Sequence, residues 1–399
     1  MKPPIPLAEA QAQLLALALP LAIEEVAVID ALGRYLAEPL VAARTQPAAA
    51  LSAMDGYALA GPDLAGPWRV IGESAAGHPF AGSVGAGEAV RISTGALMPA
   101  GTDTVLLQED AARDRDRLTL TGEPLRSGRH VRHAGFDFRQ GAMLLEAGTR
   151  VTPAVVALAF ASGHARISVR RKVRLAILDS GDELASDPSR CAPHQIPASN
   201  GVMLAAMAAG IPCSIDRIGP VADDHAALAA ALAAAEGADI IVTSGGASVG
   251  DHDLIRPALE QWGAEIAFWR VALKPGKPLL VARRGGQLIL GLPGNPVSSY
   301  VTAFLFMLPL MRALAGAGQP LPREMIAPLA TALPPVGKRL ELLRARWDGA
   351  SIAPIDEQDS SALRALSASD ALIIRPIDGA AIEAGTAVPF YCLENGGIA

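Results

Sequence analysis

The chain has 399 residues and a net charge of −6, with 51% hydrophobic and 19% charged residues. This length predicts several domains, because one hydrophobic core rarely extends over so many residues. The acidic balance, without a basic stripe, argues against nucleic-acid binding. Three widely spaced cysteines, Cys191, Cys213 and Cys392, exclude a disulfide framework or zinc pattern and favour a reducing, cytoplasmic setting.

The N-terminal 44 residues are rich in Ala and Leu, and 7–17 predicts a short amphipathic helix. Prolines and polar residues interrupt any signal-peptide core in this region. Residues 139–170 return to a helical pattern, in which Thr152 is the expected cap and Pro153 the first residue of a helix. We therefore assign residues 1–44 with 139–170 to one N-terminal helical linker domain.

Two regions read as β-rich. Residues 45–138 contain many turn signals between short runs such as WRVIGES (68–74) and AVRIS (89–93), which predicts a small inserted β domain. Residues 323–399 carry no strong helical pattern and have alternating runs such as RLELLRARW (339–347). This pattern predicts a C-terminal β-barrel or sandwich.

Residues 171–322 carry the clearest pattern, in which apolar strands alternate with helices. Strands are predicted at 173–180, 213–221, 238–244, 264–273, 278–284 and 287–292, and helices at 199–210 (capped by Ser199 or Asn200), 223–237, 253–263 and from 297 onward. Alternation of this kind predicts parallel pairing and a doubly wound α/β sheet covered on both faces. The apolar run 297–311 is too short for a bilayer, so we expect a buried helix and no membrane contact.

Three loops follow predicted strands: SGDEL (180–184), TSGGASVGDHD (243–253) and GLPGNPVSS (291–299). Ligands of open α/β sheets bind beyond the carboxyl ends of the strands, so we expect the loops at one rim. In the middle loop, bare amides of Gly245, Gly246 and Gly250 and hydroxyls of Ser244 and Ser248 suit an anion such as phosphate. For any one loop alone, a structural turn is the alternative, and no GxxxxGK[ST] motif is present.

The same rim carries four acidic residues, Asp182, Glu183, Asp251 and Asp253. Each alone is compatible with a helix cap. Carboxylates beside a phosphate site indicate a divalent cation between them, usually Mg²⁺. The glycine amides would bind the negatively charged phosphate, and the carboxylates would bind the positively charged metal. This division explains why glycines and acids share one loop.

A further motif, LKPGKP (273–278), places two lysines around a rigid Pro-Gly turn. Such a turn favours a compact oxyanion or a phosphate, and an exposed turn with solvated lysines is the alternative. SAMDGYA (52–58) and ISTGALMPAG (92–101) also stand out, but no mechanism follows from their residues alone.

Taken together, these stretches resemble the molybdopterin molybdenumtransferase (molybdenum insertase) family, which also forms the C-terminal region of gephyrin. The resemblance rests on seven motifs in the family's order, SAMDGYA, STGALMPAGTDTVLLQED, GFDFRQGAMLLEAGTR, SGDEL, TSGGASVGDHD, KPGKP and GLPGNPVS. They spread across nearly the whole chain, which makes the match specific.

The resemblance implies an L-shaped, four-domain protomer that forms a homodimer. It implies insertion of molybdate into the dithiolene of adenylylated molybdopterin, with Mg²⁺-dependent hydrolysis that releases AMP. An upstream molybdopterin adenylyltransferase is then the expected partner. Because the second domain of one subunit closes on the third domain of the other in this family, we expect an active site shared across the dimer.

The resemblance also assigns site residues. The catalytic positions are Asp55, Thr94, Asp137, Glu183, Asp223 and Asp253. The metal positions are Glu183 and Asp253, with Asp251 as the weaker candidate. Besides the glycine loop, the substrate-binding positions are Lys274, Lys277, Pro293, Gly294, Asn295, Pro296, Ser298, Arg339, Ser360 and Ser361, of which the lysines are associated with molybdate.

One position departs from the family, which usually has an Asp before the helix near residue 200, where this chain has Ala198. A carboxylate near the pterin or nucleotide is therefore missing. Two other functions stay open, a non-catalytic molybdopterin-binding scaffold of the same fold and a general Mg²⁺-dependent phosphohydrolase.

Overall fold

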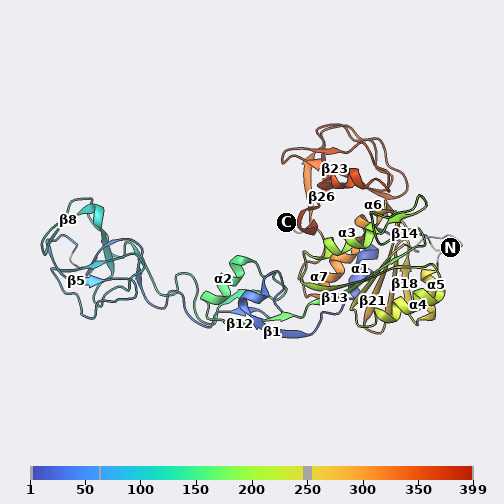
Figure 1. Cartoon of the computed structure of the whole chain (residues 1–399). Helices are drawn as coiled ribbons and strands as arrows, with labels where there is room; N and C mark the ends of the chain where they lie inside the picture. Colours follow the sequence, from blue (N-terminus) through green and yellow to red (C-terminus); the bar gives the residue numbers. More distant parts are fainter. Residues whose placement is uncertain (1–2, 63, 246–253, 398–399) are drawn as a thin grey trace.

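The computed structural model describes residues 3–62, 64–245 and 254–397. Figure 1 shows an L-shaped chain with a long arm, a corner and a short arm. We name its four parts the inserted unit (51–132) at the far end of the arm, the middle unit (23–44 and 139–170), the α/β unit (7–17 and 173–314) at the corner, and the C-terminal unit (324–392) above it.

The inserted unit is built on one six-stranded sheet of order β7-β4-β6-β5-β9-β8. Its strands are β4 Gly56–Leu59, β5 Trp68–Ser74, β6 Glu88–Ile92, β7 Thr104–Leu107, β8 Ala111–Asp114 and β9 Arg117–Leu120. A short pair, β3 Leu51–Ser52 with β10 Val131–Arg132, lies where the chain enters and leaves, and a 3-10 turn spans Gln108–Asp110. The alternating apolar residues of these strands close a small core that includes Trp68 and Leu106.

The middle unit contains fewer helices than its sequence pattern predicted. Its elements are β1 Ile23–Ala27, a 3-10 turn Val28–Ala31, β2 Leu40–Val41, β11 Met143–Leu145, helix α2 Pro153–Ala161 and β12 Arg166–Arg170. β1 pairs with β12 and β2 with β11, so segments from both sides of the insertion form one body. The Thr152 side chain accepts a hydrogen bond from the Val155 backbone N–H, which confirms the predicted cap of α2.

Helix α1, Leu7–Leu17, lies apart from the rest of the predicted linker domain. Its buried side chains Leu7, Ala10 and Leu14 join the core of the α/β unit, and Gln11 Nε2 donates to the Leu305 carbonyl at 3.0 Å. The apolar face of α1 therefore places the first helix at the corner, so residues 1–44 are divided between two units.

The α/β unit is built on a six-stranded sheet of order β16-β13-β17-β21-β20-β18. Its strands are β13 Val173–Ser180, β16 Cys213–Val221, β17 Ile240–Ser244, β18 Glu265–Trp269, β20 Leu280–Arg284 and β21 Gln287–Leu292, and its flanking helices are α3 Ser199–Ala208, α4 His225–Ala234 and α5 Ile255–Gln261. Along β13, Leu175 and Ile177 join one core, while Ala176 and Leu178 join a second core on the other face. Both faces are covered, as predicted for a doubly wound sheet.

One edge of this sheet differs from the prediction. β20 runs antiparallel to both β21 and β18, because Gly285 and Gly286 form a two-residue turn that folds β20 and β21 into a hairpin. The predicted strand 264–273 is divided, since β18 ends at Trp269 and a second strand, β19 (Leu273–Lys274), pairs with the C-terminal unit. Arg270, with a φ of 75°, marks the turn between the two strands.

One long buried helical segment follows β21. It consists of α6 Pro296–Thr302, a π-helical turn Ala303–Met307 and α7 Leu308–Leu314. By length and composition its 19 residues would suffice to cross a membrane, but 89% of the apolar window is buried within the chain. It is longer than the predicted apolar run 297–311, and it forms the centre of the corner's core.

The C-terminal unit consists mainly of strands with one short helix. The elements are β22 Glu324–Pro328, β23 Leu340–Trp347, β24 Ile352–Pro354, α8 Leu363–Ser367, β25 Ala371–Arg375, β26 Ala387–Cys392 and a 3-10 turn Glu394–Gly397. The strands pair in the open order β19-β23-β25-β26-β22, with β24 on β23. Among the described strands no pairing joins β19 to β22, so the predicted closed barrel is not confirmed.

Candidate active site

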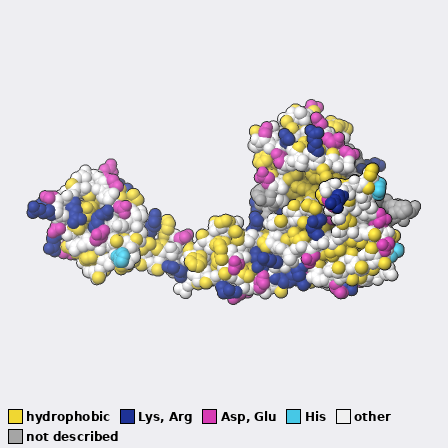
Figure 2. All heavy atoms as spheres, viewed as in Figure 1, with side chains coloured by type: hydrophobic (Ala, Val, Ile, Leu, Met, Phe, Trp, Pro, Cys, Tyr) yellow, Lys and Arg dark blue, Asp and Glu magenta, His cyan; other side chains and the backbone are white. Residues whose placement is uncertain are grey.

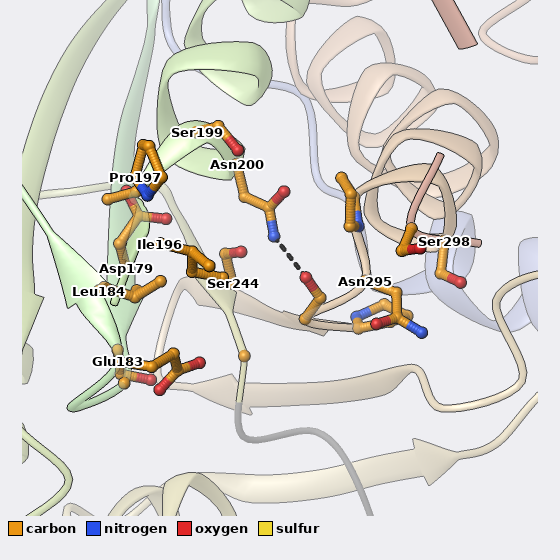
Figure 3. A pocket seen from close by; sticks show the side chains of 18 of the residues that line it. Asp179, Glu183, Leu184, Ile196, Pro197, Ser199, Asn200, Ser244, Asn295 and Ser298 are labelled. Atoms are coloured by element: carbon orange, nitrogen blue, oxygen red, sulfur yellow. Dashed lines mark hydrogen bonds between the residues drawn. The ribbon is translucent and has the colours of Figure 1, made fainter. Parts of the chain in front are cut away.

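A cavity of about 790 Å³ opens beyond the carboxyl ends of β13, β17 and β21. Residues of all three predicted rim loops line it, namely Glu183, Ser244, Gly245, Pro293, Gly294, Asn295, Pro296 and Ser298, together with Asp223 and Ser361. Figure 3 shows Glu183 on one side of this cavity and Asn295 and Ser298 on the other. The structure therefore brings ten of the sequence-predicted residues to one hollow.

Helix α3 is joined directly to the rim. Asn200 Nδ2 donates a hydrogen bond of 2.7 Å to the Gly294 carbonyl, which ties the start of the helix to the LPGNP loop (Figure 3). The prediction that Ser199 or Asn200 caps α3 is wrong, because the helix begins after Ala198 and has no side-chain cap of its own. The Asn200 amide instead joins the first turn of α3 to this loop.

The acidic residues of the rim separate into lining and supporting groups. Glu183 and Asp223 line the cavity, whereas Asp182 Oδ1 accepts a hydrogen bond of 3.1 Å from the Asp223 backbone N–H. The described ranges contain no group of three His, Cys, Asp or Glu residues placed to hold a metal. Five predicted positions, Gly246, Ser248, Gly250, Asp251 and Asp253, lie outside the described residues.

A second cavity, of about 360 Å³, adjoins the first and shares Pro278 and Ser298 with it. Its walls carry the predicted oxyanion group Lys274, Lys277, Arg339 and Ser360. Asn295 Nδ2 donates to Ser360 Oγ at 2.9 Å, which links the two cavities. Ser360 therefore belongs to the smaller cavity and Ser361 to the larger one.

Three family models match successive parts of the chain. They are "MoeA N-terminal region (domain I and II)" over residues 5–163, "Probable molybdopterin binding domain" over 176–313 and "MoeA C-terminal region (domain IV)" over 327–393. The molybdopterin molybdenumtransferase of Synechococcus elongatus is 33% identical over 93% of this chain and 94% of its own length. That of Bacillus subtilis is 32% identical over 94% of this chain and 91% of its own length.

This chain belongs to the molybdopterin molybdenumtransferase family.

Solved structures agree with this assignment. A molybdopterin biosynthesis MoeA protein from Pyrococcus horikoshii has a TM-score of 0.85 at 25% identity, covering 97% of this chain and 99% of its own. Another molybdopterin biosynthesis MoeA structure from this organism has a TM-score of 0.80 at 28% identity, covering 97% of this chain and 98% of its own. The multidomain fold predicted from the sequence is therefore confirmed.

Three family positions lie away from both cavities. The Asp55 carboxylate accepts a hydrogen bond of 2.7 Å from the Thr94 backbone N–H, and this bond lowers the pKa of Asp55. The Asp137 backbone N–H donates to the Gln46 carbonyl at 3.0 Å. Both contacts lie at the inserted unit or its junction with the arm, whereas the cavities lie at the corner (Figure 1).

Sequence reasoning missed Glu341, which faces the predicted lysines in the smaller cavity. Lys274 Nζ lies 2.6 Å from Glu341 Oε1, and the two residues are register partners of β19 and β23. Arg339 lies two residues earlier, directly before β23 (Leu340–Trp347), and both residues line the smaller cavity. The available sequence signal was the alternating run RLELLRARW, in which Glu341 lies two residues after Arg339.

Sequence reasoning also missed Asp179, which lines the larger cavity with only 4% of its surface exposed. Burial raises the pKa of its carboxyl to about 6, while the charge of Arg217 and a hydrogen bond from the Gly201 backbone oppose that rise. The available signal was a lone carboxylate at the end of the apolar strand 173–180. Its burial depends on the packing of α3 and was not predictable from the strand alone.

Proposed function

We propose that this chain inserts molybdate into the dithiolene of adenylylated molybdopterin, with Mg²⁺-dependent hydrolysis that releases AMP. The observation that carries the proposal is the pair of adjoining cavities, one lined by glycine- and serine-containing loops and one lined by cations. The two cavities share Pro278 and Ser298, so an oxyanion in the smaller cavity would lie next to a ligand in the larger one. The relatives named molybdopterin molybdenumtransferase support the molybdenum-transfer part of this reaction.

In the larger cavity we assign the phosphate to the backbone amides around Ser244 and Gly245. Glu183 and Asp223 supply the hard oxygen donors that Mg²⁺ prefers, so the described residues are compatible with this ion. Glu183 with Asp253 would hold it, and Asp251 is the weaker choice. When bound, the ion would neutralise charge on the phosphate oxygens.

In the smaller cavity we assign molybdate to Lys274, Lys277, Arg339 and Ser360. Ammonium and guanidinium groups hold a dianion by charge-assisted hydrogen bonds, and Pro275 and Gly276 fix the turn between the two lysines. Glu341 pairs with Lys274 before the oxyanion arrives, so molybdate must share or displace that contact.

We propose that the functional unit is a homodimer whose second copy supplies Asp55, Thr94 and Asp137 to the cavities. The arm holds these residues away from the corner within one chain (Figure 1). Figure 2 shows hydrophobic surface over the middle unit, where Ile29 and Phe160 are 69% and 71% exposed. Apolar surface of this kind is typical of a protein contact. We also propose that an upstream molybdopterin adenylyltransferase is a partner of this chain and that the chain is cytoplasmic.

The test is AMP release from purified adenylylated molybdopterin, followed with and without molybdate. The proposal predicts release that needs both molybdate and Mg²⁺. Release without molybdate would indicate a phosphohydrolase. Tight binding of the substrate without any release would indicate a scaffold.

A further inference from the structure

Asp179 lines the larger cavity but has no role in the proposed reaction. It lies at the end of β13, directly before the SGDEL loop, and its carboxyl group is almost fully buried. A buried carboxylate is costly unless it is hydrogen-bonded or used. Its contacts therefore indicate what it does.

One oxygen of this carboxylate is engaged by helix α3. The Gly201 backbone N–H donates to the carboxylate, and Asp179 Oδ2 lies so close to Gly201 that a side chain at this position would collide with it. Ala198 provides no side-chain cap for the same helix. Asp179 thus caps α3 from the neighbouring strand, at the position where the ten-residue helix meets the cavity.

The other oxygen, Asp179 Oδ1, is buried and has no hydrogen-bond partner among the described residues. Arg217 acts on the carboxyl through its charge. An unpaired buried acceptor has lost its hydrogen bonds to water, so a ligand that brings an N–H or O–H donor would recover that lost free energy. The free oxygen therefore points to a ligand group that donates hydrogen bonds rather than to an anion.

The surroundings of the carboxylate indicate a flat, apolar ligand. Leu184 and Ile196 are register partners in the short parallel pair β14 (Leu184–Ala185) and β15 (Ile196–Pro197). Figure 3 shows both on the same side of the cavity as Asp179. Ile196 is 56% exposed, which leaves apolar surface for a ring to cover.

We propose that Asp179 recognises the pterin, its Oδ1 accepting a hydrogen bond from the 2-amino or N3–H group of the pyrimidinone ring beside Leu184 and Ile196. This inference rests on the proposed function for the identity of the substrate. A ribose hydroxyl is also a donor, but a ribose lacks the flat apolar faces that suit this wall. The apolar wall therefore favours the pterin end of the substrate over its nucleotide end.

The test compares the wild-type protein with Asp179→Asn, using molybdopterin and AMP as separate probes in equilibrium binding. Asparagine keeps one oxygen to accept from Gly201, but it turns an NH₂ donor toward the donors of the ring. We expect at least a tenfold loss of molybdopterin affinity and an unchanged affinity for AMP. The matched control is Asp216→Asn, which removes the same charge from the exposed Asp216 of β16, outside both cavities; it should change neither affinity.

Unchanged molybdopterin affinity in Asp179→Asn, with a wild-type protein that binds molybdopterin, would overturn the inference and leave Asp179 as a helix cap. Loss of AMP affinity alone would overturn it in favour of the ribose. A wild-type protein that binds no molybdopterin would contradict the proposed function as well. These three results are distinct. The first concerns molybdopterin binding by Asp179→Asn, the second AMP binding by Asp179→Asn, and the third molybdopterin binding by the wild-type protein.

Discussion

Burial raises the pKa of the Asp179 carboxyl from 3.8 to about 6. Between about pH 4 and pH 6 the folded chain therefore holds a proton that the unfolded chain has lost. The contribution of this group to the free energy of unfolding falls over this range as the pH rises, by up to about 3 kcal/mol at 1.36 kcal/mol per pH unit. Asp179→Asn cannot titrate, so its stability relative to wild type should be higher at pH 7 than at pH 4. Urea unfolding at both pH values measures this difference. The same relative stability at both would contradict the raised pKa.

Lys274 provides a second prediction at the residue scale. Lys274→Met should lower molybdate affinity about tenfold or more, because a charge-assisted hydrogen bond contributes about 1.5–3 kcal/mol. The free energy of unfolding should change by less than about 1 kcal/mol, since the Lys274–Glu341 pair is partly exposed. Isothermal titration with molybdate measures the affinity, and Lys338→Met, outside the cavity lining, is the control. Equal losses in both variants would indicate a general charge effect and contradict a specific site.

The sequence predicted which residues reach the site where those residues directly follow the end of a strand. Glu183, Ser244 and Asn295 each follow an apolar strand, and the fold brings such ends to one rim. Asp179 and Glu341 depend on what packs against them from distant parts of the chain. Their roles therefore required the structure.

At the scale of elements, caps and apolar runs predicted most of the helices and the strands of the α/β sheet. The cap of α2 followed from Thr152 and Pro153. The division of residues 264–273 between two sheets could not be predicted, because both parts are apolar and only their partner strands distinguish them. The antiparallel direction of β20 depends on the Gly285–Gly286 turn. The alternation of strands and helices along the chain predicted parallel pairing instead.

Helix α4 offers a test of local capping. Asp224 accepts hydrogen bonds from the backbone N–H groups of Ala226 and Ala227 at 2.9 Å. Asp224→Ala should lower the free energy of unfolding by about 1 kcal/mol, the usual effect of removing such a cap. Asp216→Ala, which removes an exposed carboxylate from strand β16, should change it by less than about 0.5 kcal/mol, as is usual for a surface substitution. Denaturant unfolding of both variants decides between a cap and a surface charge, since equal effects would contradict the cap.

At the scale of the whole molecule, the L shape separates the inserted unit from the cavities (Figure 1). The division into 1–44 with 139–170, 45–138, 171–322 and 323–399 remains a prediction, and α1 shows that residues near one boundary pack elsewhere. Sequence order alone did not indicate this, because an amphipathic helix packs against any apolar partner that the fold presents.

A shared active site predicts complementation between inactive chains. Neither Asp55→Ala nor Glu183→Ala homodimers should be active, but equal mixing after reversible unfolding should restore about one quarter of wild-type activity, since half the dimers carry one intact site of two. AMP release from the mixture measures this. Activity no higher than that of the separate variants would contradict sharing.

In the proposed reaction, the two cavities couple AMP release to molybdenum transfer. The most direct measurement is a single turnover in which enzyme, adenylylated molybdopterin, Mg²⁺ and molybdate are mixed and both AMP and pterin-bound molybdenum are quantified over time. Coupled cavities should give equal amounts of both products, appearing together, and neither product without molybdate. AMP release that proceeds without molybdenum bound to the pterin would contradict this coupling.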